Sequence, residues 1–160
     1  MRIVLTESER KTVWDKMIQS EVRSYYFASL ASRYARQKQL LTGISFFLSS
    51  GAAATLVGKL PNYIAISLSI VAALIAAYSI AVSLDKRVIA LSRLHTQWSQ
   101  LCADYEHLWN HLDEEDAAQI YQELLERGRT ASENGLDLPY DEKALNKWTN
   151  FVFSRLQTTG

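Results

Sequence analysis

Few side chains in this sequence have the chemistry of metal ligands or nucleophiles. The chain contains three histidines and one cysteine. His107 and His111 lie one helical turn apart, a spacing at which two imidazoles can bind one metal ion. No HExxH motif and no pair of cysteines accompanies them. We therefore predict no metal site, and a site built on this histidine pair is the less favoured alternative.

Cys102 lacks the neighbours that covalent catalysis requires. A nucleophilic thiolate needs an adjacent base and electropositive surroundings, and the sequence around Cys102 indicates neither. The chain has no phosphate-binding loop, no dinucleotide fingerprint and no GxSxG motif. The sequence therefore predicts no catalytic residues, no cofactor and no enzymatic activity. A single cysteine also excludes an internal disulfide and indicates a reducing compartment.

The charges of the chain are balanced in number but unevenly distributed. Its 17 basic and 17 acidic residues give a net charge of zero, which argues against nucleic-acid binding. The mean hydropathy of −0.09 is that of an ordinary soluble protein. Between Gln39 and Leu84, however, Lys59 is the one ionic side chain. The mean therefore conceals a strongly apolar middle third.

Two segments of this apolar region are long enough to cross a membrane. About 30 Å of hydrocarbon requires roughly 20 helical residues. Residues 39–58 are 20 uncharged residues, and residues 62–84 are another 23. Residues 59–61 form the expected extracytoplasmic turn, because Gly58 can end one helix and Pro61 can begin the next. The alternative is a buried hairpin in a soluble bundle, which a small domain could hardly cover on all sides.

The predicted fold is all-α, a two-transmembrane helical hairpin with long cytoplasmic helical extensions. Basic residues flank both open ends of the hairpin, whereas the turn carries Lys59 alone, and this distribution places both termini in the cytoplasm. Residues 1–38 lack the apolar core of a signal peptide. We therefore expect a multi-pass protein of the cell inner membrane that keeps both spans. The flanking basic residues are Arg33, Arg36, Lys38, Lys86, Arg87 and Arg93.

The two spans contain nine serine and threonine side chains, and a plain lipid anchor needs none of them. On the first span, three of these recur at helical spacing and two alanines follow one turn later. The simpler interpretation is that this stripe of small and polar residues packs against another helix. The more specific interpretation is that it lines a water-filled pathway. No charged residue lies within either span, which argues against a proton-coupled pump or a voltage sensor. The candidate pore-lining residues are Thr42, Ser45, Ser49, Ala52 and Ala53.

Small residues on the second span are spaced by four and predict a helix-packing groove. In lipid, small side chains at this spacing allow helix backbones to approach closely, so that dispersion and weak hydrogen bonds hold the helices together. The second span should therefore pack against another helix. The predicted packing residues are Ala65, Ser69, Ala73, Ala77 and Ala81.

Both spans are expected to continue as helices in the cytoplasm. Residues 1–38 contain an amphipathic helix that runs unbroken into the first span. It should begin near Ser8 without a complete capping box, because Lys11 rather than an acidic residue stands at its N3 position. Residues 62–112 would form one continuous helix of about 75 Å, of which 85–112 is a cytoplasmic stalk.

The stalk carries an apolar seam with alternating spacings of four and three, which predicts helix–helix contacts. A second row, Leu94, Leu101 and Leu108, widens the apolar face, so the stalk must contact more than one neighbour. The expected neighbours are the N-terminal helix of the same chain and the stalk of another copy. Large aromatic rings in the seam favour more than two copies over a narrow dimer. The seam residues are Val88, Leu91, His95, Trp98, Cys102, Tyr105, Trp109 and Leu112.

Residues 113–160 are expected to form two further cytoplasmic helices. Asp113 is a candidate N-cap for a helix that Gly128 would end, and Asp141 is a candidate N-cap for the last helix. The acidic run that begins at Asp113 suits the positive end of a helix, and calcium binding is its less favoured interpretation. The last helix could dock on the stalk or lie on the anionic inner leaflet, and docking is favoured.

With this layout, the chain resembles the SLATT family, two-transmembrane effector domains associated with bacterial nucleotide-signalling and SLOG proteins. The resemblance rests on an N-terminal helix ending in SRYARQKQLL, the hairpin tip KLPN, the basic exit LDKRV and the segment LSRLHTQWSQLCADYEHLW. It implies a membrane effector that forms pores and harms the host cell when a conflict or phage-defence pathway is triggered. Because this sequence shows no nucleotide-producing or nucleotide-sensing module, activation is expected from a cytoplasmic protein partner or from the assembly state.

The leading hypothesis is a homo-oligomeric membrane effector that forms an ion-permeable channel or pore. Its expected partners are the lipid bilayer, further copies of the chain and an activating cytoplasmic protein, with no nucleic acid. Walls lined by hydroxyls rather than charges predict weak ionic selectivity. The alternative is a non-conducting membrane scaffold that presents a cytoplasmic helical bundle to a protein partner. A third possibility is a two-helix subunit of a larger hetero-complex.

Overall fold

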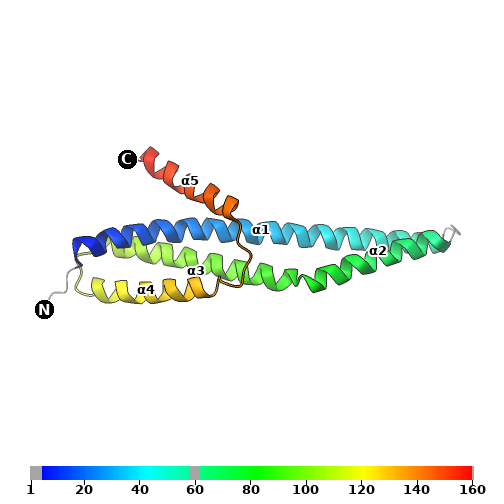
Figure 1. Ribbon diagram of the computed structural model, residues 1–160, viewed down its shortest axis with the longest axis horizontal. Helices are drawn as coiled ribbons and strands as arrows, with labels where there is room; N and C mark the ends of the chain where they lie inside the picture. The colour runs from blue at the N-terminus through cyan, green and yellow to red at the C-terminus, as the bar shows by residue number, and fades with distance from the viewer. Residues whose placement is uncertain (1–4, 58–61, 160) are drawn as a thin grey trace. The chain divides into compact units, whose positions relative to one another are not determined.

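The computed structural model describes residues 5–57 and 62–159, without the side chains of 52–57, 62 and 159. Within these ranges the chain is helical and contains no β-strand, which confirms the all-α prediction (Figure 1). The chain divides into two compact units. We call residues 5–30 with 90–159 the bundle unit and Ala31–Ile89 the pair unit. The helices are α1 (Glu7–Val57), α2 (Asn62–Ala81), α3 (Leu84–Asn110), α4 (Ala117–Glu133) and α5 (Glu142–Thr159).

The first helix begins with a complete capping box, so the prediction of a start near Ser8 without one was wrong. The Thr6 amide donates to the Glu9 carboxylate at 2.8 Å, and the Glu9 amide donates to the Thr6 hydroxyl at 3.3 Å. Thr6 is therefore the N-cap and Glu9 occupies N3, two positions earlier than expected. From there α1 runs unbroken to Val57, as the sequence predicted.

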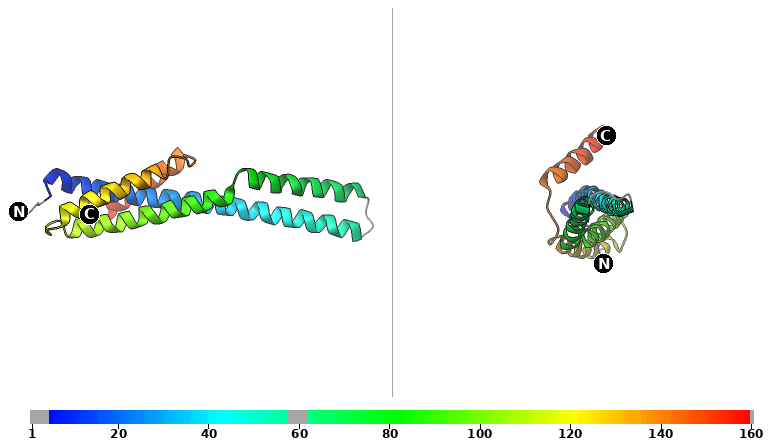
Figure 2. Two further views of the ribbon diagram at one scale, coloured as in Figure 1. Left: turned by 90° about the horizontal axis from the view of Figure 1, so that it is seen from below. Right: turned by 90° about the vertical axis from the view of Figure 1, so that its right-hand side faces the viewer.

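Three helices of the bundle unit lie side by side: the first part of α1, α3 and α4 (Figures 1 and 2). Val13 from α1, Leu124 from α4 and both apolar rows of α3 meet in one core. α3 therefore contacts two neighbours, as its wide apolar face predicted. The buried residues of α3 in this core are Leu94, Trp98, Leu101, Tyr105 and Leu108.

α4 begins and ends later than the sequence suggested. It starts at Ala117, and its N-cap Asp116 makes no side-chain capping bond, so Asp113 is not the cap. The Asp113 carboxylate instead accepts a hydrogen bond from Arg10 of α1 at 2.7 Å. Gly128 does not end the helix either, because burial of flanking residues outweighs the intrinsic helix penalty of glycine, about 1 kcal/mol.

The last helix docks on the chain itself. Asp141 caps α5 as predicted, because its carboxylate accepts a hydrogen bond from the Ala144 amide at 3.0 Å. Val152 of α5 is fully buried in a small cluster with Ile18 and Val22 of α1. The favoured prediction that the last helix docks on the stalk was therefore wrong about the partner, because α5 packs on the N-terminal helix.

The pair unit consists of the second part of α1 packed antiparallel against α2. An ion pair joins Lys38 of α1 to Asp85, just after α2. Farther along α1, Gly51 lies close to Leu68 of α2, because a Cβ atom added at Gly51 would be 3.7 Å from the Leu68 side chain. From the first contact to the second, the residue number rises on α1, from 38 to 51, and falls on the partner segment, from 85 to 68. The two helices are therefore antiparallel.

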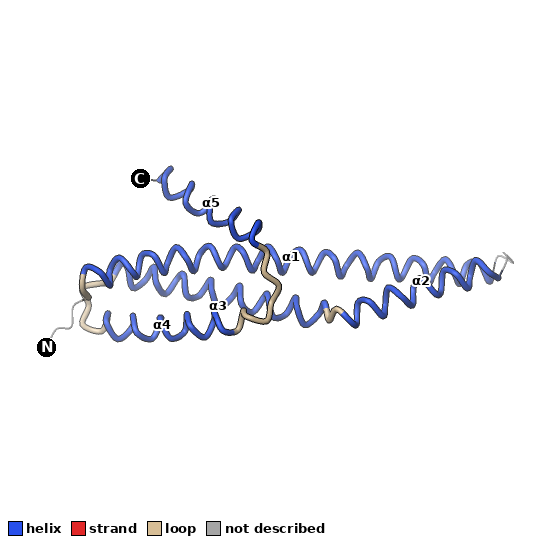
Figure 3. The backbone as a smooth tube through the Cα atoms, viewed as in Figure 1, coloured by secondary structure: helices blue, strands red, loops and turns tan. Residues whose placement is uncertain are grey.

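The expected continuous helix over 62–112 is broken between α2 and α3, where a short turn is visible (Figure 3). Ser83 adopts a left-handed backbone with φ of 50°. Its amide donates to the Ile80 carbonyl at 3.0 Å, which closes α2. Leu84 is then buried at once, with 1% of its surface exposed. This turn could not be predicted from residue type, because serine is uncommon in the left-handed region.

Replacing Ser83 by glycine should raise stability, because glycine adopts a left-handed backbone without steric penalty. We expect S83G to increase the free energy of unfolding by about 1 kcal/mol. The matched control is Ser92→Gly at an exposed position inside α3, which should lower it by about 1 kcal/mol. Thermal unfolding followed by circular dichroism measures both. Equal destabilisation by the two substitutions would show that Ser83 lies in ordinary helix.

Candidate functional site

The candidate site is a groove between α1 and α2 in the pair unit. Its volume is about 420 Å³. Three of the predicted pore-lining residues, Thr42, Ser45 and Ser49, line it together, and α2 contributes a fourth hydroxyl from Ser79. The other two predicted residues, Ala52 and Ala53, have side chains outside the described part of the chain. The remaining walls are apolar and come from Leu41, Phe46, Ile75, Ala76 and Ile80.

The groove hydroxyls are polar but carry no charge. Ser49 donates its hydroxyl hydrogen to the Ser45 carbonyl at 2.8 Å, as serines in helices commonly do. Its oxygen lone pairs remain available as acceptors. Such a surface can hydrogen-bond water or contact a cation weakly, and it offers no acid, base or nucleophile of shifted pKa.

Ser79 is the groove residue that the predicted stripe missed. The face of α2 that packs toward α1 follows alternating steps of three and four, in which Ala65 and Ala72 are buried and Ser79 is half-buried. This spacing keeps side chains on one face of a helix, whereas a strict step of four drifts by about 40° each time. The alternating spacing was therefore the signal that could have identified Ser79.

The predicted packing residues of the second span divide accordingly. Ala65 is buried inside the chain, whereas Ser69, Ala73, Ala77 and Ala81 are exposed. The line spaced by four therefore does not form the contact with α1. Its role as a surface for a helix of another chain stays a prediction.

Large apolar side chains cover much of the outer surface of the pair unit. Phe46 and Phe47 of α1 are 74% and 75% exposed, and Ile80 of α2 is 78% exposed. Among the described residues, one stretch, Tyr63–Asn110, which covers nearly all of α2 and the whole of α3, is long and apolar enough to cross a membrane, with a window of mean hydropathy 2.3. Only 11% of that window is buried, so it is not a core helix of this chain.

Charged side chains gather at the open end of the helix pair. Lys38 forms the ion pair with Asp85, and the Arg87 guanidinium lies 6.0 Å from the centre of the Tyr34 ring. A basic and aromatic rim of this kind is typical of a boundary between hydrocarbon and water.

Most residues of the predicted stalk seam pack against other helices of the same chain. Leu91, Trp98, Tyr105 and Leu112 are buried, and the other four seam residues are half-buried. Packing on α1 and α4 thus accounts for the seam pattern without a second copy. A seam contact between copies stays a prediction. The four half-buried residues are Val88, His95, Cys102 and Trp109.

The histidines take part in hydrogen bonds rather than in a metal cluster. Nδ1 of His95 lies 3.0 Å from the Ser24 carbonyl oxygen and 3.2 Å from the Ser24 hydroxyl, so the ring is hydrogen-bonded to α1. The packed, hydrogen-bonded role expected for His95 is confirmed. His107 and His111 stack with ring centres 4.3 Å apart. In the part of the chain that the structure describes, no three His, Cys, Asp or Glu side chains come together.

Cys102 lies in surroundings that suppress its nucleophilicity. Burial raises the pKa of the Cys102 thiol to about 11, and the nearby carboxylates of Glu21 and Glu106 add to the effect. The thiolate fraction at neutral pH is correspondingly small. Glu21 comes from α1, so its proximity could not be inferred from the sequence around the cysteine.

Cys102 should therefore react slowly with maleimide at pH 7 and faster as the pH approaches 11. We expect about a hundredfold slower labelling than for an ordinary exposed thiol, because the pKa is raised by two units from 9.0. The control is Ala103→Cys in a Cys102→Ala background, which places the thiol on the exposed side of α3. Labelling rates from mass spectrometry over a pH series measure the difference. Equal rates at pH 7 would contradict the assigned surroundings.

Comparison with known proteins identified no relative of this chain. No protein-family model, no curated protein and no solved structure matches it.

Proposed function

We propose that this protein is a homo-oligomeric membrane protein in which the α1–α2 groove borders an ion-permeable pathway. Residues 39–58 and 62–84 would span the bilayer as a helical hairpin. The observation that carries the proposal is the gathering of Thr42, Ser45, Ser49 and Ser79 in one groove.

Exposed apolar surface supports the membrane location. Burying apolar surface contributes about 25 cal/mol per Å², so leaving side chains such as Phe46, Phe47 and Ile80 in water is unfavourable. Monomeric soluble proteins rarely expose large contiguous apolar patches. Lipid around the pair unit would cover this surface. The basic rim near Lys38 and Arg87 would then lie on the cytoplasmic side, with both termini cytoplasmic.

An oligomer is needed because two helices cannot enclose a channel. The groove is open along its length, and further copies would have to supply the remaining walls. The exposed line of Ser69, Ala73, Ala77 and Ala81 is suited to such a contact, since small residues allow close approach of helices in lipid. Uncharged walls would give weak selectivity among ions.

The resemblance to the SLATT family favours the same function. It implies a pore-forming effector of the inner membrane in bacterial conflict or phage defence, switched on by a cytoplasmic protein or by assembly. In this proposal the bundle unit would receive the activating signal by binding or by assembly, without catalysing a reaction.

A non-conducting scaffold is the second candidate, and exposed rings on α5 favour it. Phe151 and Phe153 are 45% and 49% exposed although α5 is docked on α1. Such rings could bind a cytoplasmic partner.

Extraction of cell membranes distinguishes an embedded protein from a soluble one. We expect the protein to stay in the pellet after washing with alkaline carbonate, because two spans of about 20 apolar residues do not leave lipid. Tags at both termini should be protected from protease added outside spheroplasts. Release into the supernatant, or tags on opposite sides, would overturn the membrane hairpin.

Leucine substitutions in the groove test the conduction pathway. T42L, S45L and S49L should each reduce conductance in planar bilayers by about tenfold, because an apolar constriction excludes water. The matched control is Ser67→Leu, since Ser67 is an exposed serine on α2 that lies outside the groove and donates to the Tyr63 carbonyl in the same way. Unchanged conductance in all three groove variants would exclude the groove as the pathway. A scaffold would assemble normally and stay electrically silent in every variant.

A further inference from the structure

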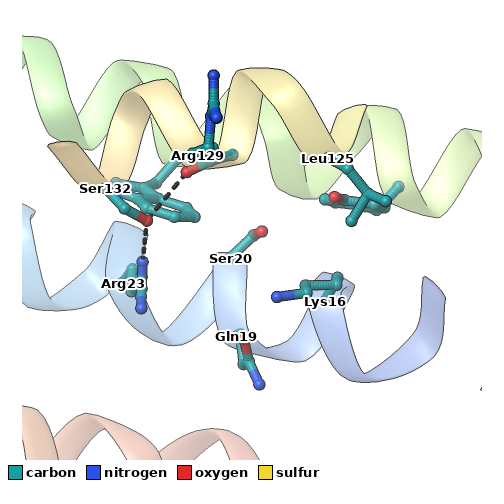
Figure 4. Close-up of a pocket in the computed structure, with 10 residues that line it drawn as sticks. Lys16, Gln19, Ser20, Arg23, Leu125, Arg129 and Ser132 are labelled. Atoms are coloured by element: carbon teal, nitrogen blue, oxygen red, sulfur yellow. Dashed lines mark hydrogen bonds between the residues drawn. The ribbon is translucent and has the colours of Figure 1, made fainter. Parts of the chain in front are cut away.

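A second cavity, in the bundle unit, gathers cationic and hydroxyl side chains from three helices. Its volume is about 160 Å³, and its walls belong to α1, α3 and α4. At about 30 Å³ for each water, it holds the equivalent of about five water molecules. In Figure 4, Arg23 of α1 lies opposite Ser132 of α4, Lys16 lies opposite Leu125, and Ser20 lies between the two cations.

Arg23 is a partly buried cation without a counter-ion. It donates to the Ser132 hydroxyl at 2.8 Å, and its guanidinium lies 4.5 Å from the centre of the Trp98 ring. Neither partner is negatively charged, and no carboxylate among the described residues pairs with Arg23. Burial lowers the pKa of this guanidinium because its hydration is only partly replaced. An anion in the cavity would compensate for that loss.

Two further groups at the cavity lack an acceptor. Trp98 is 5% exposed, and its indole Nε1 has no hydrogen-bond partner in the described part of the chain. Lys16 forms no ion pair with any described carboxylate. Ser20 is 1% exposed and provides a hydroxyl at the same wall. The Lys16 ammonium and the Ser20 hydroxyl therefore leave donors without an acceptor among the described residues at this wall, which suits a ligand rich in acceptors.

The third cation of the wall is already neutralised. Arg129 pairs with Glu126 at 2.7 Å and with Glu133 at 3.9 Å. In Figure 4 its guanidinium points away from α1. No carboxylate is among the residues that line the cavity. The uncompensated positive charge therefore comes from Lys16 and Arg23.

We propose that this cavity binds the phosphate group of a small soluble anion. A tetrahedral phosphate has acceptors in several directions, which matches the two cations Lys16 and Arg23 and the Ser20 hydroxyl at this wall. A carboxylate has only two oxygens, and chloride forms weaker hydrogen bonds. The bound phosphate neutralises Lys16 and Arg23, and Arg23 in turn donates to the hydroxyl of Ser132 in α4. Binding therefore stabilises the bundle unit, whether or not the pair unit conducts ions.

The test measures binding of inorganic phosphate to the full-length protein in a non-ionic detergent. Phosphate should raise the Tm in a saturable way at constant ionic strength, whereas chloride should not. Isothermal titration should show at least about tenfold weaker binding to K16Q and to R23Q, since each loses a charged hydrogen bond. The control Arg93→Gln removes one positive charge from an exposed position of α3 outside the cavity, and it should bind as the unsubstituted protein does.

Several results would overturn this assignment. Equal phosphate affinity in K16Q, R23Q and R93Q would show that only the general charge matters. No Tm shift with phosphate would show that the cavity holds water alone. Stabilisation by phosphatidylglycerol micelles but not by phosphate or glycerol phosphate would identify a lipid headgroup site instead of a site for a small anion. If R23Q fails to fold, K16Q decides the outcome, because Lys16 makes no described hydrogen bond or ion pair.

Discussion

The structure depends on covering the apolar faces of α1 and α3. In the bundle unit, α3 buries the seam and the second row of leucines against α1 and α4. α5 covers another part of α1, around Ile18 and Val22. In the pair unit, one face of α2 packs on α1, and the opposite faces of both helices have no covering protein. The removal of apolar surface from water therefore produces a protein core in the bundle unit and, in our proposal, a lipid-facing surface in the pair unit.

Helix periodicity and composition were sufficient to predict much of this fold. The apolar middle third, the unbroken passage of α1 beyond Lys38, the wide face of α3 and the cap at Asp141 all follow from patterns within about ten residues. The Ser83 turn and the length of α4 do not, because packing decides them. Asp113 is a good N-cap by type, yet Arg10, more than a hundred residues away in sequence, binds its carboxylate.

The candidate sites show the same division. The stripe of Thr42, Ser45 and Ser49 could be predicted because all three lie on one helix. Ser79 was missed although the alternating spacing of α2 could have identified it. The cavity around Arg23 could not be predicted, since it depends on which residues of α3 and α4 face α1. The seam was identified by its spacing, but spacing does not tell whether the neighbouring helix belongs to the same chain. That ambiguity is inherent in any heptad pattern.

The small contact that holds α5 has a consequence for how this protein opens. Three buried residues, Ile18, Val22 and Val152, form the centre of that contact, far fewer than the core of α1, α3 and α4 contains. A gap of about 350 Å³ also remains between α1 and α5. Local unfolding begins where such contacts are fewest, so α5 should detach before the three-helix core opens. Detachment of α5 would expose the apolar surface of α1 around Ile18 and Val22, to which another apolar helix could then bind.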